Sequence, residues 1–220
     1  MDVKEEIIVL FHAALVGRTD VVQNAITSIR SSGQGEKYVA GAISTGREDG
    51  ATPLHIAANF GHSDVIRALL NAGADLTATP HTGEFADKLP YQLASDSTKS
   101  TFHVYMFEQI AMGHATAIQR LVDGGINVDI RDDSSVRDST LHWACSFGSD
   151  TVAVALMCNG CDVNLSNDEG QTPLHLACKN AHKGLVEILL LEGATQMPDR
   201  AGKTPRDLIK GQGGQGQGQE

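Results

Sequence analysis

The feature that most constrains this 220-residue chain is a ten-residue segment that occurs twice. Asp49–Ala58 reads DGATPLHIAA, and Glu169–Cys178 reads EGQTPLHLAC. A third copy is shorter: Ser139–Cys145 reads STLHWAC, and its Leu141 lies 33 positions before Leu174. Repetition at this period predicts structural units that stack and bury their apolar faces against their neighbours.

Each copy carries the signals of two short helices joined by a turn. Thr52 and Thr172 can cap a helix N-terminus with the hydroxyl group, and the proline that follows each suits the first helical turn. Glycines follow the apolar blocks, and glycine readily adopts the left-handed conformation that ends a helix. These glycines are Gly61, Gly73, Gly148, Gly160 and Gly193. The pattern predicts an all-α chain with short hairpin turns.

The copies resemble the ankyrin repeat, a unit of about 33 residues with a turn and two antiparallel helices. The resemblance covers roughly residues 5–210, because weaker units and half-repeats fill the gaps between the copies. It implies an ankyrin-repeat solenoid of stacked helix–turn–helix units. Two weaker units, at Val9–Ile26 and Tyr105–Val122, divide it into two sub-arrays, residues 1–97 and 98–210. A continuous helix is expected to join the two sub-arrays.

Departures from the period locate insertions. Leu10 and Leu54 are 44 positions apart, so we expect an inserted loop at about residues 27–49, where Ser and Gly cluster. Residues 211–220 contain only Gly, Gln and Glu, and therefore have no apolar side chain to bury. We expect them to form a disordered tail or the start of a linker.

In ankyrin repeats, partner contacts usually come from the turn tips and from the two residues before the glycine that ends the first helix. By position, the resemblance implies three contacting pairs: Asn59 and Phe60, Ser146 and Phe147, and Lys179 and Asn180. Phe60 and Phe147 are the main candidates, because aromatic rings concentrate binding energy in desolvated centres. Packing under the neighbouring loops is the alternative for both. Trp143 occupies the slot of Ile56 and Leu176, which favours a core role over a partner contact at its exposed edge.

Two turns are rich in acid. They hold seven acidic residues against two arginines: Asp129, Asp132, Asp133, Asp138, Asp162, Asp168 and Glu169 against Arg131 and Arg137. Because adjacent turns of a solenoid lie side by side, we expect one acidic ridge, which would attract a Lys- or Arg-containing segment of a partner. Asp132, Asp133 and Asp168 are the candidate contacts. The alternative is a solvated surface that keeps the protein soluble.

The residues that could carry chemistry recur with the repeat. His55, His142 and His175 occupy one slot, and the resemblance implies that their rings hydrogen-bond the backbone of the turns. The CxxC motif Cys158–Cys161 has no second pair at ligand spacing, so we interpret its cysteines as structural. No glycine-rich phosphate loop is present in the sequence. We therefore expect no catalytic residue, no cofactor and no metal site.

Asn164 is a candidate modification site. Leu156, Asp162, Val163 and Asn164 resemble the pattern recognised by the asparaginyl hydroxylase that modifies ankyrin repeats. The same residues are ordinary repeat consensus, which is the alternative reading. The pattern therefore predicts hydroxylation only in a host that has the enzyme.

The composition indicates which classes of partner and which cellular compartment to expect. The chain has 17 basic and 27 acidic side chains, a net charge of −10, which disfavours broad binding to nucleic acid or to anionic membranes. The sequence contains no apolar stretch of the ~18–20 residues that a membrane span needs. Its acidic N-terminus and four cysteines favour the cytoplasm or nucleus over secretion.

The sequence thus predicts a non-catalytic protein–protein interaction module, an adaptor or scaffold that binds a protein or peptide on its concave and turn surface. The alternative is a regulatory or targeting domain of a larger enzyme or coiled-coil protein that continues past the Gly/Gln tail. Fold alone does not choose between these roles.

Overall fold

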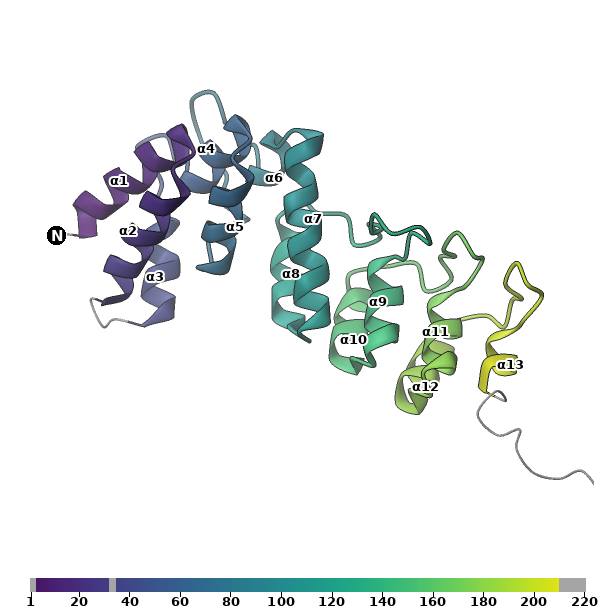
Figure 1. Ribbon diagram of the computed structural model, residues 1–220. Coiled ribbons are helices and arrows are strands. Elements are labelled where there is room, and N and C mark those ends of the chain that lie inside the picture. The colour runs from purple at the N-terminus through teal and green to yellow at the C-terminus, as the bar shows by residue number, and fades with distance from the viewer. Residues whose placement is uncertain (1–2, 32–34, 210–220) are drawn as a thin grey trace, which may run out of the picture. The chain divides into compact units, whose positions relative to one another are not determined.

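The computed structural model describes residues 3–31 and 35–209, which form α-helices connected by turns (Figure 1). Within these ranges, β structure is limited to one isolated bridge between Arg131 and Ser139. The predicted all-α fold is confirmed. The helices are α1 (Val3–Val16), α2 (Thr19–Ser31), α3 (Glu36–Ile43), α4 (Pro53–Phe60), α5 (Ser63–Asn71), α6 (Pro90–Leu93), α7 (Asp96–Ala111), α8 (Ala115–Asp123), α9 (Thr140–Phe147), α10 (Asp150–Cys158), α11 (Pro173–Lys179), α12 (Lys183–Leu191) and α13 (Pro205–Ile209).

The helices are arranged as stacked hairpins. Helix α1 packs on α2, α4 on α5, α9 on α10, and α11 on α12. First helices also pack on the first helix of the next repeat, as α1 does on α4 and α9 on α11. The short helices α6 and α13 pack on α4 and α11 in the same way, as expected for half-repeats. Each hairpin therefore depends on its neighbours for burial, as in other repeat proteins.

The chain divides into two compact units, Met1–Tyr105 with Arg120–Ile126, and Met106–Gln119 with Asn127–Glu220. The division passes through α7 and α8, since Tyr105 belongs to the first unit and Met106 to the second. The boundary between sub-arrays at residue 98 stays a prediction. Side chains of α7 make contacts in each unit. In the first unit, the Tyr105 hydroxyl donates to the Leu70 carbonyl at 3.1 Å. In the second unit, the Phe107 ring contacts Trp143.

The first helices of the repeats are nearly surrounded by protein. All six residues of Pro53–Ala58 are buried in α4, and all six of Pro173–Cys178 are buried in α11. Alanine and cysteine at the end of these segments leave room for a neighbouring helix at the usual separation of about 8–10 Å. The left-handed glycines Gly61 and Gly148 then end α4 and α9, with φ angles of 77° and 68°.

The second helix α5 buries a two-sided apolar stripe. In α5, Val65 and Ile66 are buried together with Leu69 and Leu70 one turn later. Such pairs at spacing i, i+4 present one apolar row to each flanking repeat. Removing one large side chain from such a row costs about 2–5 kcal/mol, because the cavity relaxes only partly.

The insertion predicted as a loop at about residues 27–49 is largely helical, so that prediction was wrong. Helix α2 continues to Ser31, and α3 follows from Glu36 to Ile43. Helix α3 buries Val39, Ala42 and Ile43 and packs on α1 and α2. Burial of this apolar face outweighs the loop character of the nearby Ser and Gly residues. The tail predicted for residues 211–220 lies outside the described residues.

Candidate functional site

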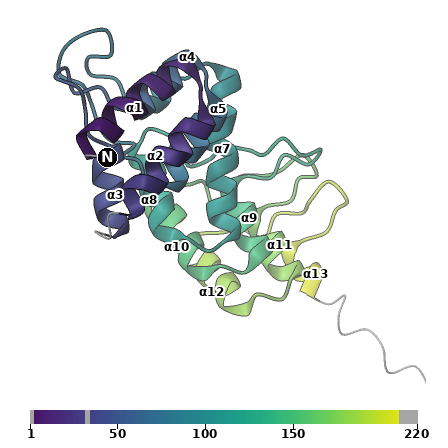
Figure 2. The ribbon, with the colours of Figure 1, turned by 60° about the vertical axis from the view of Figure 1, so that its left-hand side comes forward.

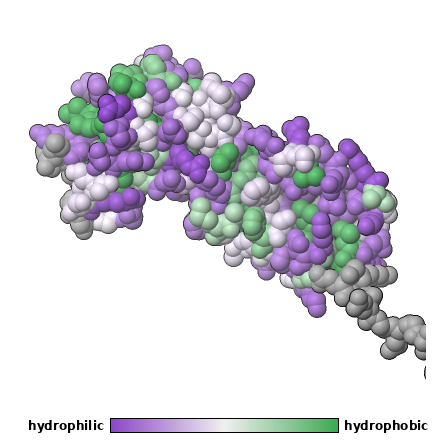
Figure 3. Space-filling view, viewed as in Figure 1, coloured by the Kyte–Doolittle hydropathy of each residue, from purple (hydrophilic) through white to green (hydrophobic). Residues whose placement is uncertain are grey.

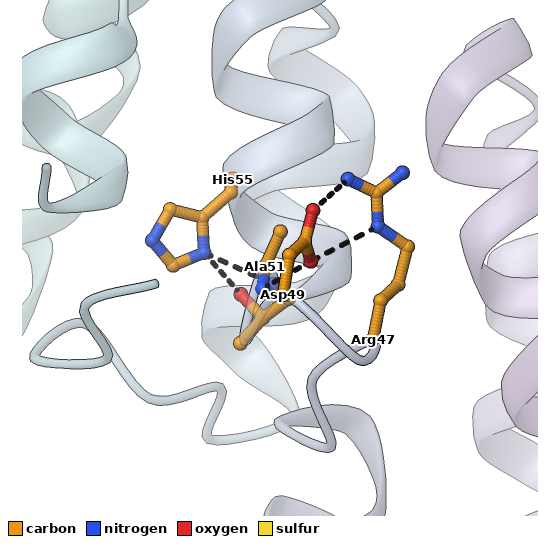
Figure 4. A network of polar contacts seen from close by, with 5 residues as sticks. Arg47, Asp49, Ala51 and His55 are labelled. Atoms are coloured by element: carbon orange, nitrogen blue, oxygen red, sulfur yellow. Dashed lines mark hydrogen bonds and ion pairs between the residues drawn. The ribbon is translucent and has the colours of Figure 1, made fainter. Parts of the chain in front are cut away.

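Three histidines hold the junctions between turns and first helices. The Nδ1 atom of His55 accepts from the Thr52 backbone N–H at 3.1 Å and lies 2.8 Å from the Thr52 hydroxyl (Figure 4). Its Nε2 atom lies 3.2 Å from the Lys88 carbonyl. Because a carbonyl only accepts, Nε2 carries the proton and Nδ1 is the acceptor. Burial lowers the pKa of His55, which favours the neutral ring that this geometry requires.

The same arrangement recurs in the second unit. His142 Nδ1 lies 2.7 Å from the Ser139 hydroxyl, and its Nε2 lies 2.8 Å from the Gln171 carbonyl. His175 Nδ1 lies 2.9 Å from the Thr172 hydroxyl, and its Nε2 lies 3.1 Å from the Lys203 carbonyl. Each histidine ring thus hydrogen-bonds both to the residue before its own helix and to a backbone carbonyl of the following turn. The prediction that these histidines hydrogen-bond the backbone of the turns is therefore confirmed in all three copies.

The turn before α4 has a further polar network. The Asp49 carboxylate accepts from the Ala51 backbone N–H at 3.0 Å and from the Arg47 guanidinium at 2.7 Å (Figure 4). The backbone hydrogen bond, followed by the contacts with Arg47, lowers the pKa of Asp49. The network therefore orders the turn that leads into the first TPLH segment.

The contact pair predicted in the first unit lies at the end of α4. Asn59 and Phe60 are both exposed, and Phe60 keeps 51% of its surface accessible. The Phe60 ring stacks on His62, with centroids 6.5 Å apart and planes inclined by 14°. Local packing therefore orients this ring but leaves much of it accessible to a partner.

In the second unit, the predicted pairs lie at the ends of α9 and α11. Ser146, Phe147, Lys179 and Asn180 are all exposed. The Asn180 side chain donates to the Ser146 carbonyl at 3.4 Å, so the pairs of successive repeats touch. One position departs from the repeat: Ala181, not glycine, follows the last pair, and it adopts a left-handed φ of 58°.

Trp143 connects the core of the second unit to its surface. Its ring is half-buried, with centroid distances of 5.1 Å to Phe107 and 5.7 Å to Phe147, which is 54% exposed. The indole N–H donates to the Asp132 carboxylate at 2.8 Å. Trp143 is therefore not simply a core residue in the slot of Ile56: it orients one of the predicted acidic contacts.

Several acidic side chains of the turns accept hydrogen bonds within their own turn or from the next one. Asp132 Oδ1 accepts from the backbone and hydroxyl of Ser134 at 3.2 and 2.7 Å. Asp129 accepts from the backbone N–H of Asp162 in the next turn, and burial raises the pKa of Asp129. Figure 2 shows the turns before α9, α11 and α13 side by side. Asp133 and Asp168 are exposed on these turns.

A hollow of about 300 Å³ lies where the aromatic and acidic residues meet. We call it the Trp143 hollow, and its lining residues are Asp132, Ser134, Val136, Asp138, Trp143, Ser146 and Phe147. A second hollow of about 540 Å³ includes Asp168 and Lys179 in its lining. The structure thus brings six of the predicted contact residues together at two hollows of the second unit. Asn59 and Phe60 belong to the first unit, and Asp133 and Asn180 line neither hollow.

Sequence reasoning missed two groups at the Trp143 hollow. Phe107 backs the indole, although nothing in the sequence of α7 indicates which residue meets Trp143. Asp138 was counted among the turn acids but not as a contact; it lines the hollow and accepts from the Asn167 side chain at 2.7 Å. The acidic bias of the turn was the only signal for Asp138.

The Asn164 amide is engaged on both sides. Its Oδ1 accepts from the backbone and hydroxyl of Thr195 at 2.8 and 3.0 Å, and its Nδ2 donates to the Gly193 carbonyl at 3.1 Å. The side chain therefore links two successive turns of the second unit. Its hydroxylation stays a prediction, and the enzyme would first have to release this amide from its partners.

The cysteines are free thiols. Cys145, Cys161 and Cys178 are buried, and Cys158 is exposed. Burial raises the pKa of Cys145 and Cys178, and raises that of Cys161 to about 12, which disfavours the reactive thiolate. Among the described residues, no group of three His, Cys, Asp or Glu side chains is arranged to hold a metal ion.

Stacked hairpins with a TPLH junction and a left-handed glycine define the class of ankyrin-repeat domains, and this chain belongs to the ankyrin-repeat family. A family model described as "Ankyrin repeats (3 copies)" matches residues 106–200. A second model, "Ankyrin repeat", matches residues 49–80. Together the two matched segments cover more than half of the chain. Domains of this family are generally non-catalytic interaction modules.

Among curated proteins, the chain is similar to Rabankyrin-5 from Homo sapiens, with 32% identity over 152 residues, which is 66% of this chain and 13% of that protein. It is 29% identical over 143 residues to the "Transient receptor potential cation channel subfamily A member 1 homolog" from Caenorhabditis elegans, covering 65% and 10% of the two chains. The human channel of that name matches at 40% over 83 residues, or 36% of this chain and 7% of the channel. The chain thus spans about a tenth of the length of these relatives.

None of the helices within residues 3–31 and 35–209 combines the length and the apolar character that crossing a bilayer requires. Exposed apolar side chains in Figure 3 occur as separate patches among hydrophilic ones.

Proposed function

We propose that the chain is a non-catalytic adaptor or scaffold that binds a partner protein or peptide against the turns and first helices of its second unit. The observation that carries the proposal is the Trp143 hollow. Phe147 offers an exposed ring there, and Trp143 is held in place by Phe107 and Asp132. Rigid aromatic groups bind at a low ordering cost, because their conformation is set before the partner arrives.

The acidic turns support a partner with a basic segment. Asp133 and Asp168 are both exposed, and Asp168 lines the second hollow. Exposed charges of one sign speed the encounter with a segment of the opposite sign, and salt screens that effect. Replacing Asp133 with Ser and Asp168 with Asn should lower the association rate and flatten its salt dependence, whereas an unchanged rate at all salt concentrations would exclude a basic partner.

The chemistry of the described residues supports binding rather than catalysis. His55, His142 and His175 are engaged with the backbone of the turns, and three of the four thiols are buried. Free thiols fit a reducing compartment, so we place the protein in the cytoplasm or nucleus. Microscopy of the tagged chain tests this placement, and accumulation in the secretory pathway would contradict it.

A pull-down with quantitative mass spectrometry tests the proposed function. Wild-type chain is compared with Phe147→Ala, with Phe60→Ala, and with Leu191→Ala as a matched control. Leu191 is an 86% exposed apolar residue on α12 that lines neither hollow. We expect specific interactors to be lost with Phe147→Ala and retained with Leu191→Ala. Because Phe60 belongs to the first unit, Phe60→Ala should also retain them. An interactor set that does not change with Phe147→Ala would refute the proposal.

The relatives favour a second candidate, in which these residues regulate or target a much larger protein. The matched relatives are roughly ten times longer than the segment they share with this chain. Immunoblotting of native extract with an antibody to the second unit tests this candidate. A band far above 23.3 kDa is expected, and a band at 23.3 kDa would argue against it.

A further inference from the structure

The Trp143 hollow has the size of one side chain. Its volume of about 300 Å³ lies at the lower limit of small-molecule pockets, and the hollow is open to solvent. The Trp143 and Phe147 rings in its lining are tilted by 45° to each other. A partner side chain that entered would therefore meet aromatic surface.

The lining of the hollow also includes acidic side chains. Asp132 and Asp138 both belong to the lining, and none of the seven lining residues is basic. The neighbouring Arg131 guanidinium donates to the Arg137 carbonyl at 3.1 Å, within its own turn. An apolar side chain in the hollow would desolvate the two carboxylates without pairing them, which is costly. Charge complementarity therefore favours a cationic occupant.

Both carboxylates are oriented but keep the ability to accept. Asp132 accepts two bonds from Ser134 and one from Trp143, and Asp138 accepts one from Asn167. A carboxylate offers about four acceptor sites, so each retains at least one. Their orientation is set before binding, which reduces the entropy lost when a donor arrives.

We propose that the Trp143 hollow binds an arginine side chain of the partner peptide, with the guanidinium stacked on Phe147 and hydrogen-bonded to Asp132 and Asp138. This inference rests on the proposed function. A guanidinium is planar and weakly hydrated, so it stacks on aromatic rings, and its five N–H donors can reach two carboxylates at once. A lysine ammonium is a strongly hydrated point charge and satisfies the aromatic wall less well.

The chain contains a single tryptophan, so Trp143 reports on the hollow without labelling. Random peptides displayed on phage are selected on the full chain, and bound peptides are then titrated while the indole N–H resonance is followed by NMR. We expect selected peptides to share one arginine and to shift this resonance. Changing that arginine to lysine should weaken binding about tenfold, and changing it to citrulline, an uncharged isostere, by more.

Two variants of the chain complete the test. Phe147→Ala should remove the preference for arginine over lysine, and Asp132→Asn, which keeps an acceptor for the indole, should weaken binding about tenfold. Phe60→Ala, in the first unit, is the matched control and should bind as wild type. Circular dichroism confirms that each variant is folded.

The outcomes separate this inference from the proposed function. Peptides that shift the Trp143 resonance but lack a shared arginine, or that tolerate lysine equally, would overturn the arginine assignment and leave peptide binding intact. Peptides that bind without shifting the resonance would also overturn it. A library that yields no bound peptide would count against both.

Discussion

Replacing Ala181 with glycine should stabilise this protein. Ala181 adopts a left-handed φ of 58° at the position where Gly61 and Gly148 have φ angles of 77° and 68°. A left-handed conformation costs an L-residue about 1–2 kcal/mol, because Cβ crowds the following carbonyl oxygen. Ala181→Gly removes that strain but increases the backbone entropy of the unfolded chain, which costs about 0.4–1 kcal/mol. The net expectation is a stabilisation of about 0.5–1 kcal/mol.

Two glycine variants calibrate this estimate. A Cβ at Gly160 (φ 79°) would meet no atom within 4 Å, so Gly160→Ala introduces backbone strain alone and should cost about 1 kcal/mol. A Cβ at Gly148 would lie 2.5 Å from the His182 ring, so Gly148→Ala adds a clash and should cost more. The structure therefore predicts the order Ala181→Gly, wild type, Gly160→Ala, Gly148→Ala from most to least stable.

Urea unfolding followed by circular dichroism and by Trp143 fluorescence measures these differences. In a chain of this size, the stabilisation of Ala181→Gly corresponds to a rise in Tm of about 1–4 °C. The two probes also show whether the second unit, which contains Trp143, unfolds with the rest of the helices. The reasoning fails if Ala181→Gly lowers the urea concentration at half unfolding while Gly160→Ala lowers it as expected. In that case the left-handed conformation of Ala181 does not destabilise the folded chain.

Three further predictions concern other parts of the chain. Burial lowers the pKa of His142 below its unfolded value, so the unfolded chain binds more protons than the folded chain. The stability contributed by His142 should therefore be full above about pH 6.5 and fall on acidification. His142→Gln should reduce that fall in urea titrations. Asn164→Ala should lower the free energy of unfolding by about 1–3 kcal/mol in calorimetry, because it leaves hydrogen-bonding groups of Gly193 and Thr195 without their partner. Asn180→Ala removes one side-chain hydrogen bond of 3.4 Å and should change that free energy little. Equal losses for the two variants would contradict the structure. Iodoacetamide should label Cys158 alone among the four thiols of the folded chain, and mass spectrometry showing native labelling of buried Cys145 would argue against the packing of α9.

The local parts of the fold could be predicted from the sequence. The Thr-Pro pairs of α4 and α11, the recurring Leu-His pair of all three copies, and the glycines that end α4 and α9 act within a few residues, so they revealed the positions of these helices. Helix α3 was missed because its apolar face has meaning only against α1 and α2, and the Ser/Gly stretch before it resembles a loop.

For the candidate site, the sequence determined which residue types stand at the turn tips and helix ends, namely an exposed phenylalanine, a tryptophan and several acids. Only the tertiary structure decided that the Trp143 indole bonds Asp132, that Phe107 lies behind it, and that Asp138 shares the same hollow. The physical reason is the separation along the chain between the residues that interact. Helix signals depend on neighbours in the chain, whereas the hollow depends on side chains that packing of separate turns and helices brings within a few ångströms.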